Sequence, residues 1–380
     1  MSGKKMIAAA VSAIMVCSLS FPSLAFASVK VDETELAQGE NAVGGGTATL
    51  AGGSLDMAGV TAKYLYTDES LNVNFNGGND LESAIVAGSA EVEMNFSGDN
   101  EVEDITASDQ ASVTINANGH NDFEEVTAND NSNITLKVAG ENSFESIDGH
   151  DNASIVVKGV TCQMRDIINL GDGESFSAIS TQNGKLTIDH VTINLKSESA
   201  YVGSTGSDVV IDTSKIAQQD DNEDSSINAQ GTMKIFESVI DIKGTVFTNG
   251  LMTIEHSDAK VAKPAGAIYD KVPRVHSRTG IELIREKNGE VIKEVYEGED
   301  DWRLDTGDGD TVDLKADGKP AYYKCSDSDD EESAVKGMPK TADETSLFPP
   351  VVAAIASAAL AAFVSRRTSG MGAGANGARF

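Results

Sequence analysis

The sequence predicts an all-β protein built as a β-solenoid, a stack of coils made of short parallel strands, and three observations support this prediction. A repeat of 21 residues runs through residues 77–157 without drifting. Within each repeat the apolar residues alternate at a spacing of two, as in Val113 and Ile115, which is the periodicity of a strand. Aromatic residues make up only 5% of the chain, so we expect a narrow core of small aliphatic side chains.

Eight columns of this repeat keep their register over four copies. They are Gly77, Gly98, Gly119 and Gly140; Asn79, Asn100, Asn121 and Asn142; Leu81, Val102, Phe123 and Phe144; Glu82, Glu103, Glu124 and Glu145; Ala84, Ile105, Val126 and Ile147; Gly88, Asp109, Asp130 and Asp151; Val92, Val113, Ile134 and Ile155; and Met94, Ile115, Leu136 and Val157. Glycine, asparagine and aspartate tolerate the positive φ of tight corners, whereas a helical repeat would need apolar spacings of three and four. We therefore expect successive coils to stack about 4.8 Å apart around one shared core.

A looser set of repeats continues this pattern. Glycine-headed segments with alternating apolar residues begin at Gly184, Gly231 and Gly250, and the coils there vary from 19 to 24 residues. The sequence thus predicts about nine coils over residues 56–262, on the order of 45 Å in length, behind an N-terminal cap over residues 28–55. The coil pattern resembles the right-handed parallel β-helix of the pectate-lyase-like kind, and a two-layer β-roll is the alternative.

The region that follows, residues 263–325, has the signals of a small antiparallel β module. Strand-like segments over 281–285 and 291–295 flank Asn288-Gly289, a strong hairpin turn signal. We expect this module to cover the open end of the solenoid, where strand edges would otherwise be unpaired. Its aromatic residues are interpreted as its core in preference to a sugar platform; they are Trp302, Tyr322 and Tyr323. An acidic linker over residues 326–337 comes next.

The C-terminal segment carries three parts in series. These are Met338-Pro339-Lys340-Thr341-Ala342-Asp343 (residues 338–343), an apolar run over residues 347–364, and Arg366-Arg367 within a tail over residues 365–380. As a helix, the apolar run would reach about 27 Å and just cross a membrane, and the arginines would keep the tail cytoplasmic. An uncleaved membrane anchor and a buried apolar helix are the alternatives.

This arrangement resembles the cell-wall sorting signals of Gram-positive surface proteins, whose pattern is L-P-x-T-G, a hydrophobic segment and a positive tail. The resemblance implies cleavage by a sortase after Thr341 and linkage of its carbonyl to an amine of peptidoglycan. The processing residues would be Met338, Pro339, Lys340, Thr341 and Ala342. Met338 replaces the family's leucine and Ala342 its glycine, and these departures leave the class of sortase open.

The N-terminal segment independently indicates export. Lys4 and Lys5 precede an apolar stretch, and Ala25 and Ala27 are the small residues that a signal peptidase recognises. We expect a helical signal peptide over residues 1–27, with cleavage before Ser28. The predicted location is therefore extracellular and wall-anchored, or membrane-anchored if the chain is not processed.

The charge of the chain limits its partners. With 60 acidic and 29 basic residues the net charge is −31, which disfavours nucleic acid and anionic lipid surfaces but leaves cationic partners open. Beyond the signal peptide only Cys162 and Cys325 remain, so a single disulfide and two free thiols are both compatible with the sequence.

The acidic columns are the candidate metal sites. Stacking would place carboxylates about 4.8 Å apart, where each neighbouring pair repels by roughly 1 kcal/mol in water. Calcium could bridge such a file, because hard cations take several carboxylate oxygens, whereas a solvated acidic face needs no ion. The residues concerned are Glu82, Glu103, Glu124 and Glu145, and Asp109, Asp130 and Asp151.

No catalytic constellation stands out in the sequence. The fold that the coils resemble hosts pectin lyases and glycosidases, but Lys137 is the only lysine or arginine from Gly77 to Val157, which disfavours a lyase. Arg165 and Asp166 are interpreted as a surface ion pair, and the histidines as solvated corner residues. We expect a surface protein that binds a glycan or protein ligand or acts as an adhesin, without catalysis or a required cofactor. A carbohydrate-active enzyme and a passive structural coat protein remain as alternatives.

Overall fold

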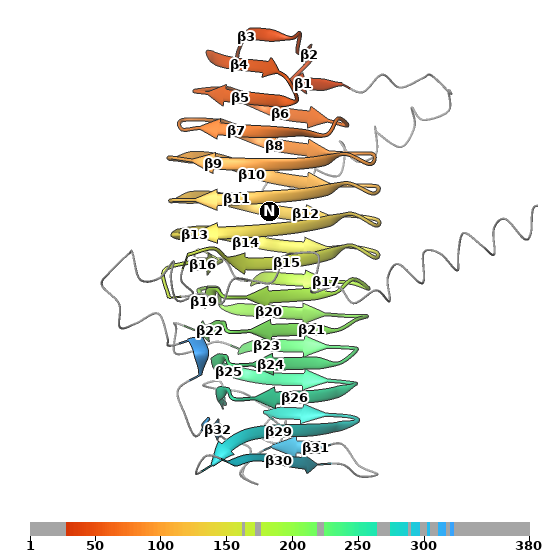
Figure 1. Cartoon of the computed structure of the whole chain (residues 1–380), viewed down its shortest axis with the longest axis vertical. Coiled ribbons are helices and arrows are strands. Elements are labelled where there is room, and N and C mark those ends of the chain that lie inside the picture. The colour runs from red at the N-terminus through yellow and green to blue at the C-terminus, as the bar shows by residue number, and fades with distance from the viewer. Residues whose placement is uncertain are drawn as a thin grey trace, which may run out of the picture. The chain divides into compact units, whose positions relative to one another are not determined.

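The computed structural model describes residues 28–161, 164–171, 176–218, 224–263, 274–287, 290–296, 302–304, 311–316 and 320–322. All of these lie in the first of two units of the chain, residues 1–326; the second unit, residues 327–380, is outside the described residues. Every element in the described part is a β-strand, and the strands form a β-solenoid of about nine turns with coils of about 21 residues (Figure 1). The fold class predicted for the repeats is confirmed.

The expected signal peptide, linker, sorting motif and membrane segment fall outside the described residues. Within the part that the structure does describe, no helix is long and apolar enough to span a membrane.

The strands belong to two sheets that form opposite faces of the stack. The 14-stranded sheet contains β3 (Gly39–Val43), β4 (Gly46–Ala51), β5 (Ser54–Ala58), β7 (Leu71–Asn76), β9 (Glu91–Ser97), β11 (Ser112–Asn118), β13 (Asn133–Ala139), β15 (Ser154–Gly159), β18 (Leu186–Asp189), β21 (Val209–Asp212), β24 (Met233–Phe236), β26 (Leu251–Glu255), β29 (Gly280–Lys287) and β30 (Glu290–Tyr296). The 18-stranded sheet contains β1 (Val29–Val31), β2 (Thr34–Glu35), β6 (Thr61–Thr67), β8 (Asp80–Val86), β10 (Asn100–Ala107), β12 (Asn121–Ala128), β14 (Glu141–Gly149), β16 (Ile167–Leu170), β17 (Phe176–Thr181), β19 (Thr192–Leu195), β20 (Ser199–Ser204), β22 (Lys215–Gln218), β23 (Asp224–Ala229), β25 (Val239–Thr248), β27 (Asp258–Ala262), β28 (Val275–Ser277), β31 (Trp302–Leu304) and β32 (Thr311–Leu314).

The predicted register is confirmed for the apolar columns. Val113 pairs with Ile134, and Ile134 with Ile155, in parallel strands one coil apart. The looser repeats are also in register, because Leu186 pairs with Val209 in the next coil. The apolar columns therefore continue through the stack, and their side chains form one hydrophobic core.

The cross-section of the solenoid changes along the stack. In the first coils one long, bent strand forms each layer of the 18-stranded sheet, whereas β14 pairs with both β16 and β17 in the next layer. The described residues around 160–176 belong to the longer coil at this transition, between the strands that contain Ile155 and Leu186. Later coils consequently have three short strands where the earlier ones have two.

Antiparallel strands cover both ends of the stack. At the N-terminal end β3 and β4 continue the sheet that β5 begins, and β1 pairs with β6. At the other end the parallel stacking extends beyond residue 262, because β28 pairs with β25 and β29 with β26. The hairpin expected there is confirmed, since Lys287 pairs with Glu290, and β30, β31 and β32 add the antiparallel pairs.

Tyr322 packs against the solenoid itself and not in a separate module. Its side chain is 3% exposed, and its hydroxyl lies 2.7 Å from Thr192 Oγ1 in β19. The neighbouring Ala321 N–H donates to Glu237 Oε2 at 2.5 Å. The last described segment of the chain therefore lies along the side of the stack.

One phenylalanine in each regular coil fills the centre of the core. Phe75 and Phe96 belong to the 14-stranded sheet and their rings are stacked with centroids 4.4 Å apart. Phe123 and Phe144 belong to the opposite sheet and stack at 4.8 Å, while Phe96 meets Phe123 edge to face at 5.1 Å. The ring thus changes sides of the core between two coils without interrupting the aromatic stack.

Candidate functional site

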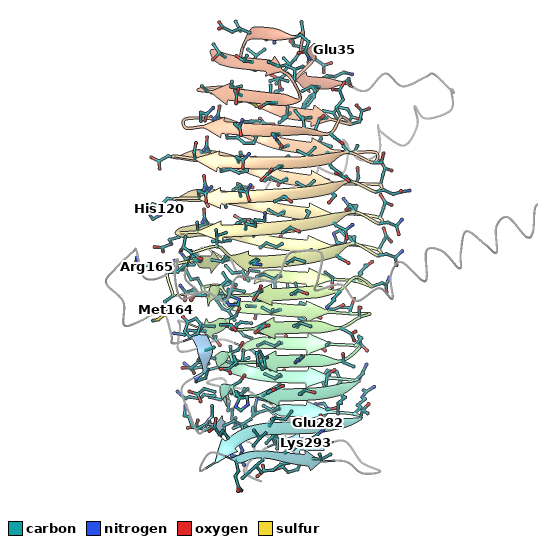
Figure 2. All side chains as sticks on the ribbon, viewed as in Figure 1. Glu35, His120, Met164, Arg165, Glu282 and Lys293 are labelled. Carbon is teal, nitrogen blue, oxygen red and sulfur yellow. The ribbon has the colours of Figure 1, made fainter. Side chains whose placement is uncertain are left out.

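The structure contains a groove of about 560 Å³ on one flank of the regular coils. The groove runs over the first residues of β8, β10, β12 and β14 and over β16. In each coil this is the corner where the chain leaves the 14-stranded sheet. His120, which lines it, lies on the same flank as Met164 and Arg165 (Figure 2). The residues that line the groove are Gly78, Asn79, Asp80, Asp99, Asn100, Glu101, His120, Asn121, Asp122, Glu141, Ser143 and Asn169.

The repeat explains how these residues come together. The asparagine column forms the floor of the groove, and the residues before and after each asparagine form rows on either side of it. The row before contains Gly78, Asp99, His120 and Glu141; the row after contains Asp80, Glu101, Asp122 and Ser143, followed by Asn169 from the next coil. A motif of the form x-Asn-x at 21-residue intervals is thereby converted into two parallel rows of side chains.

The groove is strongly anionic. Five carboxylates line it, and no lysine or arginine does so among the described residues. Glu141 Oε1 accepts a hydrogen bond of 2.6 Å from Asn169 Nδ2. The carboxylates of Asp80, Glu101 and Asp122 form no ion pair with any described residue, so the field of this row is not neutralised within the part of the chain that the structure describes.

The buried asparagines form the amide ladder that the sequence predicts, but with a break. Asn79 Nδ2 donates to Asn100 Oδ1 at 2.9 Å, and Asn121 Nδ2 donates to Asn142 Oδ1 at 2.8 Å. Between these pairs, Asn100 Nδ2 turns away to the carbonyl oxygens of Ser97 and Gly98.

The break leaves one acceptor unsatisfied. Asn121 is only 4% exposed and lines the groove, yet its Oδ1 has no hydrogen-bond partner among the described residues. A buried polar atom without a partner costs about 1–3 kcal/mol, and a donor that reached this buried oxygen would recover that free energy.

The predicted glutamate column lies at a bend of the long strands. The register pairs Val102 with Phe123 and Asp104 with Glu125, and omits Glu103 and the glutamates stacked with it. Asp104 stacks directly on Glu125 of the next coil. Burial, followed by the charge of Glu125 and those of three glutamates of this column, raises the pKa of Asp104 from 3.8 to about 6.

The aspartate column has a structural role at the opposite corner. Asp109, Asp130 and Asp151 adopt positive φ of 63°, 61° and 54°. Asp109 Oδ2 accepts a hydrogen bond of 2.9 Å from the N–H of Gly88, and Asp130 Oδ2 accepts one of 3.1 Å from the N–H of Asp109. Each of these two carboxylates thus caps the backbone of the preceding coil.

We expect the acceptor oxygen of Asp130, and not its charge, to stabilise this corner. Asp130→Asn keeps an acceptor and tolerates positive φ, so its free energy of unfolding should change by less than about 0.5 kcal/mol. Asp130→Ala loses both features and should destabilise the protein by about 1–2 kcal/mol. Chemical denaturation of the two variants tests this expectation, and equal losses for both would contradict it.

The described residues contain no group of three or more histidine, cysteine, aspartate or glutamate side chains arranged to hold a metal ion. The carboxylates of the expected calcium columns are spread along the stack, with one member in each coil. Calcium binding by these columns stays a prediction, which a binding measurement with and without calcium tests.

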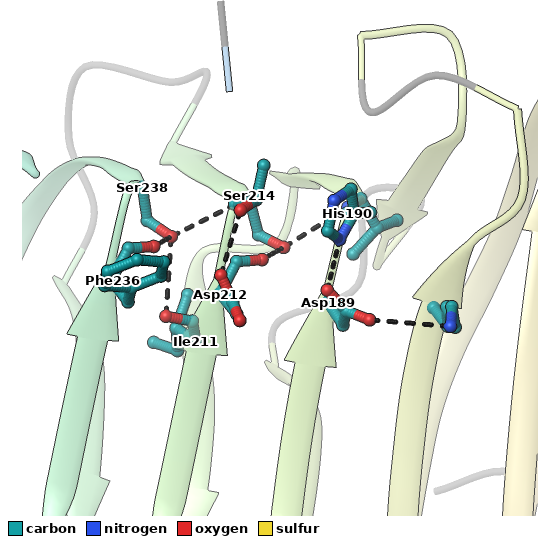
Figure 3. Close-up of polar contacts among 10 residues, drawn as sticks. Asp189, His190, Ile211, Asp212, Ser214, Phe236 and Ser238 are labelled. Atoms are coloured by element: carbon teal, nitrogen blue, oxygen red, sulfur yellow. Dashed lines mark hydrogen bonds and ion pairs between the residues drawn. The ribbon is translucent and has the colours of Figure 1, made fainter. Parts of the chain in front are cut away.

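A serine ladder in the later coils replaces the asparagine ladder, and sequence reasoning missed it. The N–H groups of Val191 and Ser214 donate to the hydroxyls of Ser214 and Ser238, at 3.2 and 3.1 Å (Figure 3). Each hydroxyl in turn donates to a carbonyl oxygen two residues earlier, as Ser238 does to Phe236 at 2.6 Å. The ladder continues to Ser257, whose hydroxyl accepts from the N–H of Ser238 at 3.0 Å. A residue with positive φ precedes each of the four positions; the set is His190, Thr213, Glu237 and His256.

His190 and His256 therefore occupy equivalent corners of different coils, which agrees with their interpretation as corner residues. His190 Nδ1 is hydrogen-bonded to Asp189 Oδ1, and this bond raises the pKa of His190 above its usual value. His120 differs from both because it lines the acidic groove.

The interpretation of Asp166 as part of a surface ion pair is wrong. Asp166 is fully buried, and it accepts hydrogen bonds from the N–H and the hydroxyl of Thr161, at 2.6 and 2.5 Å. It also accepts a longer one, of 3.4 Å, from the N–H of Gly140. Asp166 thus links Thr161, where the irregular loop starts, to Gly140 in the last regular coil. The sequence alone did not predict that these three residues meet.

Comparisons with known proteins give no relatives. No family model, no curated protein and no solved structure matches the chain.

Proposed function

We propose that this chain is an exported, wall-anchored surface protein whose β-solenoid displays an acidic elongated surface for ligand binding or adhesion, without catalysis. The observation that carries the binding part is the groove of about 560 Å³ lined by five carboxylates. A concave surface with convergent polar groups is the usual form of a ligand site. The rigid stack on which it lies favours extended ligands over compact ones.

The location rests on the sequence of both ends. The segment before Ser28 resembles a secretory signal peptide, and Met338 to Ala342 resemble a sortase motif that precedes an apolar segment and paired arginines. The partners that this implies are a sortase, peptidoglycan and, before processing, the membrane.

A binding experiment with a catalytic readout tests the proposed role. The purified protein is applied to a glycan array with and without calcium, and the same glycans are assayed for release of reducing sugars. Selective binding without release supports the proposal, whereas release indicates a carbohydrate-active enzyme. Silence in both measurements indicates a structural coat protein. Binding that requires calcium would assign a role to the acidic columns.

Blocking the sortase step should move the protein out of the wall fraction. In a Gram-positive host that expresses a sortase, Thr341→Ala removes the residue whose carbonyl would be transferred, so we expect most of the protein to shift from the wall to the membrane fraction. Met338→Leu, which restores the family's leucine, is the matched control and should stay wall-linked. Fractionation and immunoblotting measure the distribution, and a wall-linked Thr341→Ala protein would rule out this anchoring route.

A further inference from the structure

We propose that the acidic groove binds an extended oligomer of amino sugars, with the protonated amines paired to the carboxylate rows. This inference rests on the proposed binding function and names its ligand class. Five carboxylates line the groove, and among its described lining residues there is no lysine or arginine. A ligand that carries amines would supply the missing positive charge.

The spread of the carboxylates favours a long ligand over a single ion. No three acidic or imidazole side chains in the described residues are clustered closely enough to hold a metal. They are instead distributed over the starts of five strands from β8 to β16, a distance of about 20 Å at the spacing of stacked strands. One cation cannot neutralise such a row, whereas a chain with regularly spaced amines can.

The unsatisfied amide points to a ligand with hydrogen-bond donors. Asn121 is 96% buried on the floor of the groove, with an Oδ1 that no described residue satisfies. An amino sugar carries hydroxyl and ammonium groups, both of which donate hydrogen bonds. Either group, once a shift of the groove floor lets it reach the buried Oδ1, would satisfy Asn121 while the neighbouring charges pair with the Asp122 and Glu101 carboxylates.

The geometry of the groove distinguishes an amino sugar from a basic peptide. The backbone positions of Asp80, Glu101 and Asp122 follow one another at the strand spacing of about 4.8 Å, whereas an extended peptide presents side chains on one face about 6.8 Å apart. A β-1,4-linked sugar advances by about one coil height per residue, and successive sugars turn their amines to opposite sides. The rows on either side of the asparagine floor provide carboxylates for both orientations, Asp99 and Glu141 in one row and Glu101 and Asp122 in the other.

The test compares two hexasaccharides that differ only in charge: β-1,4-linked glucosamine and its fully N-acetylated form. Binding to the full chain is measured by isothermal titration calorimetry, with EDTA present and at a pH below the pKa of the sugar amines. We expect the charged oligomer to bind, to weaken with added salt, and to bind at least tenfold more tightly than the acetylated oligomer.

Groove variants locate the site. Glu101→Gln with Asp122→Asn should weaken binding of the charged oligomer by about tenfold. The matched control, Glu40→Gln with Glu91→Gln, removes the same charge from exposed positions of the 14-stranded sheet and should bind as the wild type does. Circular dichroism and the thermal midpoint confirm that each variant is folded.

Several results would overturn the proposal. These are equal binding of both hexasaccharides, equal weakening in the control variant, and tighter binding of oligolysine than of the charged oligomer. If the array finds a different glycan that binds the groove variant as tightly as the wild type, this inference fails and the proposed binding function stands. If no ligand binds anywhere, both fail.

Discussion

Phe123→Ala should lower the free energy of unfolding by about 3–5 kcal/mol, the largest effect that we expect from a single substitution in the solenoid. Phe123 is 1% exposed and stacks with Phe144 on one side while meeting the edge of Phe96 on the other. In the opposite sheet, Ala117 of the same coil occupies the position that pairs with Phe96, so Phe123 is the only phenylalanine of this coil. Removing the ring therefore interrupts the aromatic stack between Phe96 and Phe144 and leaves a cavity in this coil. Chemical denaturation measures the loss.

A compensating substitution makes this prediction specific. Ala117 pairs with Phe96 in the preceding coil, so a phenylalanine at residue 117 would continue the stack that Phe75 and Phe96 form at 4.4 Å. Ala117→Phe alone should overpack the core and cost about 1–3 kcal/mol.

Combined with Phe123→Ala, Ala117→Phe should recover about half of the loss, because each coil then again contains one ring. If the double variant lost as much free energy of unfolding as the two single variants together, the prediction would be wrong. Restoring the volume of the ring from the opposite sheet would then not be enough to stabilise the coil.

Asp104→Asn should stabilise the protein at neutral pH. The pKa of Asp104 is raised from 3.8 to about 6 in the folded protein, mainly by burial and then by neighbouring glutamates. Because the folded state binds the proton more tightly than the unfolded state, the free energy of unfolding falls as pH rises from about 4 to about 6 and stays lower above that range. Replacing the carboxyl by an amide removes this dependence, with a gain at pH 7 on the order of 1–3 kcal/mol.

Denaturation curves at several pH values test this expectation. The difference between Asp104→Asn and the wild type should vanish near pH 4, where the carboxyl is protonated in both states. Asp80→Asn, which changes an exposed aspartate of β8, is the matched control and should alter stability by less than about 0.5 kcal/mol at every pH. A constant gain across the whole range would contradict the electrostatic explanation.

The repeat made the regular part of the fold predictable. A period of 21 residues fixes which residues stack, so the pairing of Val113 with Ile134 followed directly from the alignment of the columns. The looser coils were also placed correctly, because their glycine-headed segments keep the alternation of a strand. The boundary at residue 262 was less predictable. The strand around Ile281 has a hairpin signal on one edge, but its other edge pairs in parallel with β26, and such long-range pairing leaves no local signal.

The groove was predictable in principle and was missed. Its rows obey the same period, as Asp80, Glu101 and Asp122 show, but the row that contains Asp99 also contains a glycine and a histidine. A search for identical residue types overlooks a row whose members share position and differ in chemistry. The unpaired Oδ1 of Asn121 could not be predicted, because it depends on the rotamer of Asn100.

The contact of Tyr322 with Thr192 decides how the solenoid responds to a pull on the following chain. Tension that enters at residue 322 reaches the flank of β19 and Glu237 before it reaches the terminal strands, because Tyr322 and Ala321 are bonded there. The force is then shared by hydrogen bonds in the middle of the stack instead of peeling β30 from its free edge. We therefore expect a pull on the following chain to load this side contact before it loads the last coil.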